Sequence, residues 1–211
     1  MPLLLCDLDE TLLDRTDALR RWASGFVESR GLPATDVERI VSEDRHGRRT
    51  RDEFVAAVDA ALRPDPPLTI DYLRDYVRCF ELAPSTAGAL RRARDAGWRI
   101  AVVSNGEQPQ LDKIALVGLD RLVDAVCVSA FDGCRKPDPR LFRLAAERAG
   151  APLEGAWMIG DDPVADVGGA DAAGVRSVWL RLGRTWSHEL PPPTAQADSF
   201  AAAVDLVLTA D

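Results

Sequence analysis

Lysine and histidine are scarce in this sequence of 211 residues. The 26 basic side chains include only two lysines, Lys113 and Lys136, and the histidines are His46 and His188. A histidine-based catalytic triad or a multi-histidine metal site needs several partners at fixed geometry, so the sequence offers few candidates for either. We therefore expect any chemistry to depend on carboxylates, since the chain has 34 acidic residues.

Cysteines and long apolar runs are also few. Cys6, Cys79, Cys127 and Cys134 form no C-x-x-C pair, and no apolar stretch approaches the length of a membrane span. The sequence contains no G-x-G-x-x-G loop either. These absences argue against a disulfide scaffold, a membrane partner and a dinucleotide site, and they favour a reduced protein of the cytoplasm.

The composition is that of a globular chain, with 46% hydrophobic, 28% charged and 6% aromatic residues. The net charge of −8 argues against a nucleic-acid partner. This acidity is uneven, because residues 15–83 carry 12 bases and 13 acids while the rest of the chain carries 14 bases and 21 acids. Of the net charge of −8, −7 therefore belongs to the part outside 15–83.

Short apolar runs alternate with helical stretches over most of the chain. We expect strands at 2–6, 98–103, 125–128, 156–159 and 175–180, and helices at 85–96, 139–149 and 199–208. Such alternation predicts an α/β fold with a Rossmann-like parallel sheet, helices on both faces and a ligand site beyond the carboxyl ends of the strands.

Residues 15–83 break this alternation, because they contain no strand-like run. The pattern predicts helices at 18–30, at 52–62 after a capping Thr50 and at 70–80 after Thr69. We therefore predict two domains, with 1–14 and 84–211 forming the α/β core and 15–83 forming an inserted all-α domain.

Polar side chains follow three of the expected strands at the point where each strand ends. They are Asp7 and Asp9, Ser104 and Asn105, and Asp161 and Asp162. In a parallel sheet these groups converge, and clustered carboxylates at neutral pH call for a bound divalent ion such as Mg²⁺, which prefers oxygen ligands. Lys136 supplies a compact positive charge of the kind that phosphoryl transfer needs.

Four ordered motifs carry a resemblance to a known family. They are Asp7-Leu-Asp9-Glu-Thr11, Val103-Ser-Asn105-Gly, Lys136-Pro-Asp-Pro and Gly160-Asp-Asp-Pro-Val-Ala-Asp166. Together they resemble the haloacid dehalogenase superfamily, in its phosphatase branch with a helical cap inserted after the first motif. The resemblance spans nearly the whole chain, and residues 15–83 occupy the place of the cap.

The resemblance implies a role for each motif residue. Asp7 is the nucleophile that forms an aspartyl phosphate, and Asp9 is the general acid and then the general base. Asp7 and Asp161 are side-chain ligands of Mg²⁺, and the backbone carbonyl of Asp9 also faces the metal.

The remaining motif residues are implied to hold the phosphate. The Ser104 hydroxyl and the Asn105 backbone N–H bind phosphoryl oxygens, and Lys136 neutralises their charge. Thr11 braces the loop of the first motif and belongs to the phosphate-binding set, and Asp166 orients Lys136. Asp162 departs from the family pattern, where Ser or Thr is common, and is assigned a supporting role.

Asp9 distinguishes activities within this superfamily. The resemblance implies that the carbon–halogen hydrolases lack an aspartate at this position. We therefore expect a Mg²⁺-dependent phosphomonoester hydrolase acting on a small phosphorylated metabolite. A phosphomutase of the same superfamily stays open as an alternative, and a receiver-like signalling module is disfavoured by the length of the chain and by the helical insert.

Substrate and oligomeric state (monomer or dimer) stay open at this stage. One basic run lies in the helical insert, with His46 among Arg45, Arg48, Arg49 and Arg51. A solvated surface turn is the simpler interpretation of this run, and contact with an anionic substrate is the alternative.

Overall fold

A computed structural model describes residues 1–45, 47, 49–64, 68, 72–186 and 189–210. The chain divides into two compact units. Met1–Leu13 and Leu82–Asp211 form the first, which we call the α/β unit, and Asp14–Glu81 form the second, which we call the helical unit.

The α/β unit is built on one sheet of six parallel strands in the order β3-β2-β1-β4-β5-β6. The strands are β1 (Leu3–Cys6), β2 (Arg99–Ser104), β3 (Ala125–Val128), β4 (Trp157–Gly160), β5 (Arg176–Leu180) and β6 (Ala195–Ala197). The predicted fold class and the five predicted strands are confirmed. The sequence pattern does not reveal β6, because Ala-Gln-Ala at the edge of the sheet forms no apolar run.

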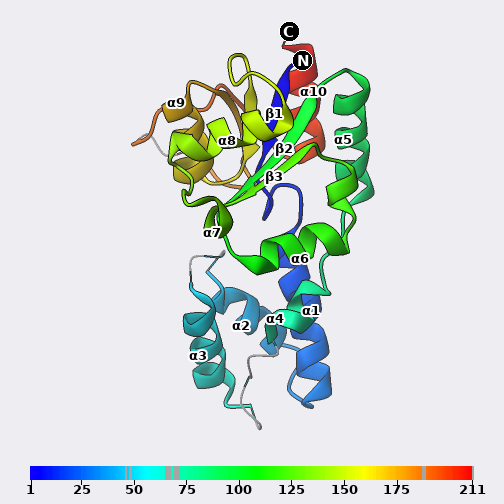
Figure 1. The fold of residues 1–211 in the computed structure, drawn as a ribbon. Coiled ribbons are helices and arrows are strands. Elements are labelled where there is room, and N and C mark those ends of the chain that lie inside the picture. Colours follow the sequence, from blue (N-terminus) through cyan, green and yellow to red (C-terminus); the bar gives the residue numbers. More distant parts are fainter. Residues whose placement is uncertain (46, 48, 65–67, 69–71, 187–188, 211) are drawn as a thin grey trace. The chain divides into compact units, whose positions relative to one another are not determined.

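Helices cover both faces of this sheet. The helices of the α/β unit are α5 (Pro84–Asp95), α6 (Gln108–Leu116), α7 (Ser129–Asp132), α8 (Pro139–Ala149), α9 (Gly169–Ala173) and α10 (Phe200–Thr209), with a short 3₁₀ helix η1 (Leu119–Arg121) and a π-helical turn η2 (Pro163–Gly168). Figure 1 shows α5 and α10 on one side of the strands and α8 and α9 on the other. Two covered faces explain why the strands read as continuous apolar runs.

The core between the sheet and α8 is closely packed. Leu3 and Leu5 of β1 are fully buried there, together with Phe142 of α8. Gly169 begins α9 against that ring, and a Cβ at this position would lie 2.7 Å from Phe142. Only glycine therefore lets α9 approach α8 this closely.

The helical unit contains α1 (Arg15–Ser29), α2 (Asp36–Glu43), α3 (Arg51–Leu62) and α4 (Tyr72–Val77). Thr50 and Glu53 cap the start of α3 reciprocally, as expected for Thr50. The sequence pattern does not single out α2, and Thr69 and the predicted start of the helix at 70–80 lie outside the described residues.

In the described part of the chain, none of the helices combines the length and the apolar character of a membrane span.

Candidate active site

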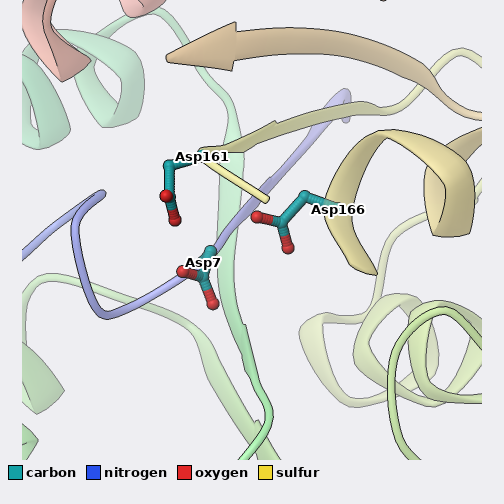
Figure 2. Close-up of side chains that lie close together, drawn as sticks. All are labelled: Asp7, Asp161 and Asp166. Atoms are coloured by element: carbon teal, nitrogen blue, oxygen red, sulfur yellow. The ribbon is translucent and has the colours of Figure 1, made fainter. Parts of the chain in front are cut away.

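The carboxyl ends of β1 and β4 bring three aspartates together. β1 and β4 are neighbours in the sheet, so Asp7 after β1 and Asp161 after β4 emerge at the same edge. Asp166 reaches the same place from η2. Each of the three offers a carboxylate oxygen within 4.8 Å of those of the other two, and Figure 2 shows the side chains pointing toward one another.

Lys136 lies between two of these carboxylates. Its Nζ donates to Oδ1 of Asp7 at 2.5 Å and to Oδ1 of Asp166 at 2.6 Å, and the lysine is only 3% exposed. Burial alone would lower the pKa of Lys136, but the carboxylates of Asp166 and Asp7 outweigh burial and raise it. Lys136 is therefore a permanent cation in this cluster.

Gly160 allows Asp166 to come this close. A Cβ at Gly160 would lie 2.2 Å from Oδ2 of Asp166. The same oxygen accepts a hydrogen bond from the Asp162 backbone N–H at 2.9 Å. The glycine that ends β4 is therefore a steric condition for the position of Asp166, and through it for that of Lys136.

Asp161 is held by a residue that lies outside the four sequence motifs. Nη2 of Arg184, in the loop after β5, donates to Oδ2 of Asp161 at 3.0 Å and to its carbonyl oxygen at 2.7 Å. Burial raises the pKa of Asp161 to about 7, with a further contribution from the Asp166 carboxylate and an opposing one from Arg184. Asp161 thus binds protons more readily than an ordinary aspartate.

The donor set fits a small divalent cation. Three carboxylates within 4.8 Å face two cations, Lys136 and Arg184, so one negative charge is left over when all three are ionised. Burial also raises the pKa of Asp7, against the opposing effect of Lys136. A hard cation with oxygen ligands, such as Mg²⁺, matches this donor set.

Asp9 lies in a second polar cluster and not among the three carboxylates. Nζ of Lys113, on α6, donates to both carboxylate oxygens of Asp9 at 2.8 Å. Gln110, also on α6, donates from Nε2 to Asp9 at 3.0 Å and to the Ser104 hydroxyl at 2.9 Å. From the sequence alone, Lys113 is assigned no role in the site. The scarcity of lysine was the signal that could have singled it out.

The other predicted site residues occupy three further positions. The Asn105 side chain joins the ends of β2 and the Lys136 segment, because its Oδ1 accepts from the Lys136 N–H at 2.8 Å and its Nδ2 donates to the Lys136 carbonyl at 2.9 Å. Asp162 caps η2, accepting from the backbone N–H groups of residues 164 and 165 at 2.8 Å each. Thr11 Oγ1 is buried and has no hydrogen-bond partner among the described residues.

The helical unit has a cavity of its own, of about 1060 Å³. Its lining includes Asp44, which is buried and accepts two hydrogen bonds from Arg15 at 2.5 and 2.6 Å. Arg45 and Arg49 of the basic run also line it, and Arg49 forms an ion pair with Glu43. His46 and Arg48 of the same run lie outside the described residues.

Comparison with known proteins gives a consistent set of similarities. The family model for haloacid dehalogenase-like hydrolases matches residues 1–174. The chain is 41% identical over 107 residues to a phosphoserine phosphatase from Thermus thermophilus, covering 50% of this chain and 43% of that protein. It is 28% identical over 192 residues to a glyceraldehyde 3-phosphate phosphatase from Pyrococcus abyssi, covering 84% of this chain and 80% of that protein.

A similar fold is found among solved structures. The HAD-hydrolase YfnB from Bacillus subtilis, solved bound to magnesium, superposes with a TM-score of 0.76 at 22% identity, covering 98% of each chain. This similarity concerns the fold. The matched part of this chain spans less than half of the phosphoserine phosphatase.

Proposed function

Because this chain belongs to the haloacid dehalogenase-like hydrolase family, we propose that it is a Mg²⁺-dependent phosphatase that hydrolyses small phosphomonoesters through an aspartyl phosphate. The observation that carries the proposal is the buried Lys136 between Asp7 and Asp166, beside the carboxylate of Asp161. The names of the two phosphatase relatives support it.

Asp7 is the nucleophile in this proposal. One of its carboxylate oxygens attacks phosphorus, the bond between phosphorus and the ester oxygen breaks, and Asp9 gives its proton to the departing oxygen. Asp9 then takes a proton from water, whose oxygen attacks the phosphorus of the aspartyl phosphate, and the bond between phosphorus and the Asp7 oxygen breaks. Inorganic phosphate leaves, and Asp7 and Asp9 return to their starting states.

The phosphoryl group is held by residues at the ends of β2 and β1 and by Lys136. The Ser104 hydroxyl and the Asn105 backbone N–H donate to its oxygens, and the Lys136 ammonium neutralises the charge that they carry. Asp166 keeps Lys136 in place at 2.6 Å. The buried Thr11 hydroxyl completes this set.

The side chains of Asp7 and Asp161 and the backbone carbonyl of Asp9 would hold Mg²⁺. When bound, the ion neutralises charge on the phosphoryl oxygens and orients them for in-line attack. The negative charge left over among the three carboxylates supports this assignment.

Two relatives support a class of substrate. Phosphoserine and glyceraldehyde 3-phosphate are small phosphomonoesters, and we propose a substrate of this size. We also propose that residues 15–83 act as a cap that selects the part of the substrate beyond the phosphate. The aspartate at position 9 supports hydrolysis of a phosphate ester over hydrolysis of a carbon–halogen bond. Hydrolysis of a phosphate ester needs a proton donor for the leaving oxygen, and Asp9 can supply that proton.

The test is hydrolysis of 4-nitrophenyl phosphate, with excess Mg²⁺ or with a chelator, by wild type and by Asp7→Asn. Asp171→Asn, at an exposed position of α9, is the matched control. We expect the chelator and Asp7→Asn each to reduce the rate by about 10⁴-fold or more and Asp171→Asn to leave it unchanged. Full activity after either treatment would contradict the mechanism. Hydrolysis releases inorganic phosphate and 4-nitrophenol in equal amounts, whereas transfer of the phosphoryl group to a sugar releases less inorganic phosphate than 4-nitrophenol.

A further inference from the structure

Helix α6 carries two buried polar side chains that the proposed chemistry does not use. Gln110 is 6% exposed and Lys113 is 3% exposed. They are three residues apart, so they lie on the same face of α6 about one turn from each other. A buried ammonium is costly unless it meets an anion, so the position of Lys113 needs an explanation.

The anion that Lys113 meets is Asp9. Its Nζ lies 2.8 Å from each of the two carboxylate oxygens, so the ammonium faces the carboxylate symmetrically. A third hydrogen bond, 2.8 Å long, runs from the same Nζ to Oε1 of Gln110. Lys113 therefore binds Asp9 and also fixes which way the Gln110 amide points.

Gln110 extends the network to the end of β2. With its oxygen facing Lys113, its Nε2 donates to Oδ2 of Asp9 at 3.0 Å and to the Ser104 hydroxyl at 2.9 Å. The general acid and base of the proposed mechanism and one of its phosphate-binding groups are thus held by one helix. A hydrogen-bonded network of this kind restricts the rotamers of all its members.

We propose that Lys113 and Gln110 are positioning residues that hold the Asp9 carboxylate and the Ser104 hydroxyl in the geometry needed for proton transfer to the leaving oxygen. This inference rests on the proposed phosphatase function. It differs from a stabilising role alone, in which Lys113 and Asp9 would form an ion pair whose loss affects folding but leaves the chemistry of the folded protein unchanged.

The leaving group of the substrate distinguishes the two roles. An alkoxide needs a proton as it departs, whereas 4-nitrophenolate departs without one near neutral pH. If Asp9 is misplaced, the loss in kcat/KM is therefore larger for an alkyl phosphate than for 4-nitrophenyl phosphate. A loss of stability alone lowers both values by the same factor, through the fraction of folded enzyme.

The variants are Lys113→Met, Lys113→Arg and Gln110→Met, compared on phosphoserine and on 4-nitrophenyl phosphate. Gln108→Met is the control, because Gln108 is exposed on the same helix and donates to Asp112. We expect Lys113→Met to lose about 10²-fold in kcat/KM on the alkyl phosphate and about tenfold or less on the aryl phosphate, with kcat changing more than KM. Gln110→Met shows the same trend with a smaller loss.

Lys113→Arg keeps a cation and several donors, so we expect it to recover part of the activity that Lys113→Met loses. Gln108→Met behaves as wild type. Equal losses on the two substrates would overturn the proposal. So would a Lys113→Met loss that is unchanged in an Asp9→Asn background, because a residue that acts through Asp9 loses its effect when Asp9 cannot transfer a proton.

A spectroscopic measurement separates this inference from the proposed function. The chain has two lysines, so protein labelled with ¹⁵N at lysine Nζ gives two ammonium signals, and Lys113→Arg identifies one of them. We expect Asp9→Asn to shift the Lys113 signal strongly and the Lys136 signal weakly. If this shift occurs but wild type hydrolyses no phosphomonoester, the proposed function fails. If wild type is active and the shift is absent, the positioning role fails.

Discussion

The two lysines of this chain lie in two polar clusters that differ in charge balance. Lys136 meets two carboxylates, Asp7 and Asp166, and a third carboxylate, Asp161, lies beside them with Arg184 as its partner. Among the described residues, Lys113 forms an ion pair with the carboxylate of Asp9. The first cluster has more acid than base, and the second pairs one acid with one base.

This difference indicates which cluster binds a cation. Several buried carboxylates repel one another, and protons or a metal ion relieve the repulsion. The cluster around Lys136 therefore has a reason to take up Mg²⁺, while Lys113 balances the charge of the Asp9 side chain. The sequence alone does not reveal this difference in charge balance, because Asp7 of the first cluster and Asp9 of the second are only two residues apart.

Removing each lysine in turn tests the contrast most strongly. Without Mg²⁺, we expect Lys136→Met to lower the free energy of unfolding by about 3–5 kcal/mol, because it leaves buried carboxylate charge without its partner. Lys113→Met costs less, because the side chain of Asp9 is 24% exposed and water can solvate its charge. With Mg²⁺, Lys136→Met regains stability, because the ion takes the place of the missing cation. Lys113→Met gains no more from Mg²⁺ than wild type does.

Urea unfolding with Mg²⁺ and with a chelator measures both effects, and each variant serves as the control for the other. The assignment of the cation to the cluster around Lys136 would be wrong if Mg²⁺ stabilised the two variants by the same amount.

Proton uptake by Asp161 makes the stability of the protein, and its stabilisation by Mg²⁺, depend on pH. We expect this effect to be smaller than the effect of removing Lys136. In the metal-free folded protein its pKa is about 7, above the value in an unfolded chain. The folded state therefore holds more protons between about pH 4 and pH 7, so this group contributes stability that is present at low pH and is lost as pH rises toward 7 and above. Mg²⁺ competes with that proton, so stabilisation by Mg²⁺ grows over the same range.

The size of the stabilisation by Mg²⁺ can be calculated for one proton on Asp161 that competes with the ion. At a Mg²⁺ concentration of about 100 times its Kd, the gain is about 2.7 kcal/mol at pH 8. At pH 5.5 the apparent affinity is about 30-fold weaker, which leaves roughly 0.8 kcal/mol. Thermal unfolding at the two pH values, with and without Mg²⁺, measures the difference. In Asp161→Asn we expect the Mg²⁺ effect to be small at both values, and a pH dependence that survives this substitution would contradict the assignment.

The sequence predicts the sheet and most of the cluster around Lys136 for a physical reason. Strands buried on both faces read as apolar runs, and the carboxyl ends of parallel strands meet, so Asp7 and Asp161 are expected to converge. The position of β6 is not visible in this way, because a three-residue edge strand needs no apolar run.

The same reasoning does not predict the residues that bind Asp9 and Asp161. Lys113, Gln110 and Arg184 lie on a helix and a loop, and they reach the site only because of how α6 and the segment after β5 pack on the sheet. The spacing of Gln110 and Lys113 places them on one face of a helix, but it does not say what that face meets. Direction of packing is a tertiary property, so only the structure supplies it.

Substitution of Asp162 tests whether its carboxylate belongs to the cluster around Lys136. We expect a smaller change in stability here than in the preceding predictions. Its side chain accepts two backbone hydrogen bonds at the start of η2, and its own N–H donates to Asp166. We expect Asp162→Ala to lower the free energy of unfolding by about 1 kcal/mol, the usual cost of a lost cap, whereas Asp162→Asn keeps an acceptor and stays within a few tenths of wild type. Calorimetric titration of Mg²⁺ into Asp162→Asn decides whether the charge matters as well. An unchanged Kd places Asp162 in the capping structure alone, while a Kd weakened tenfold would add its carboxylate to the charges that attract the ion.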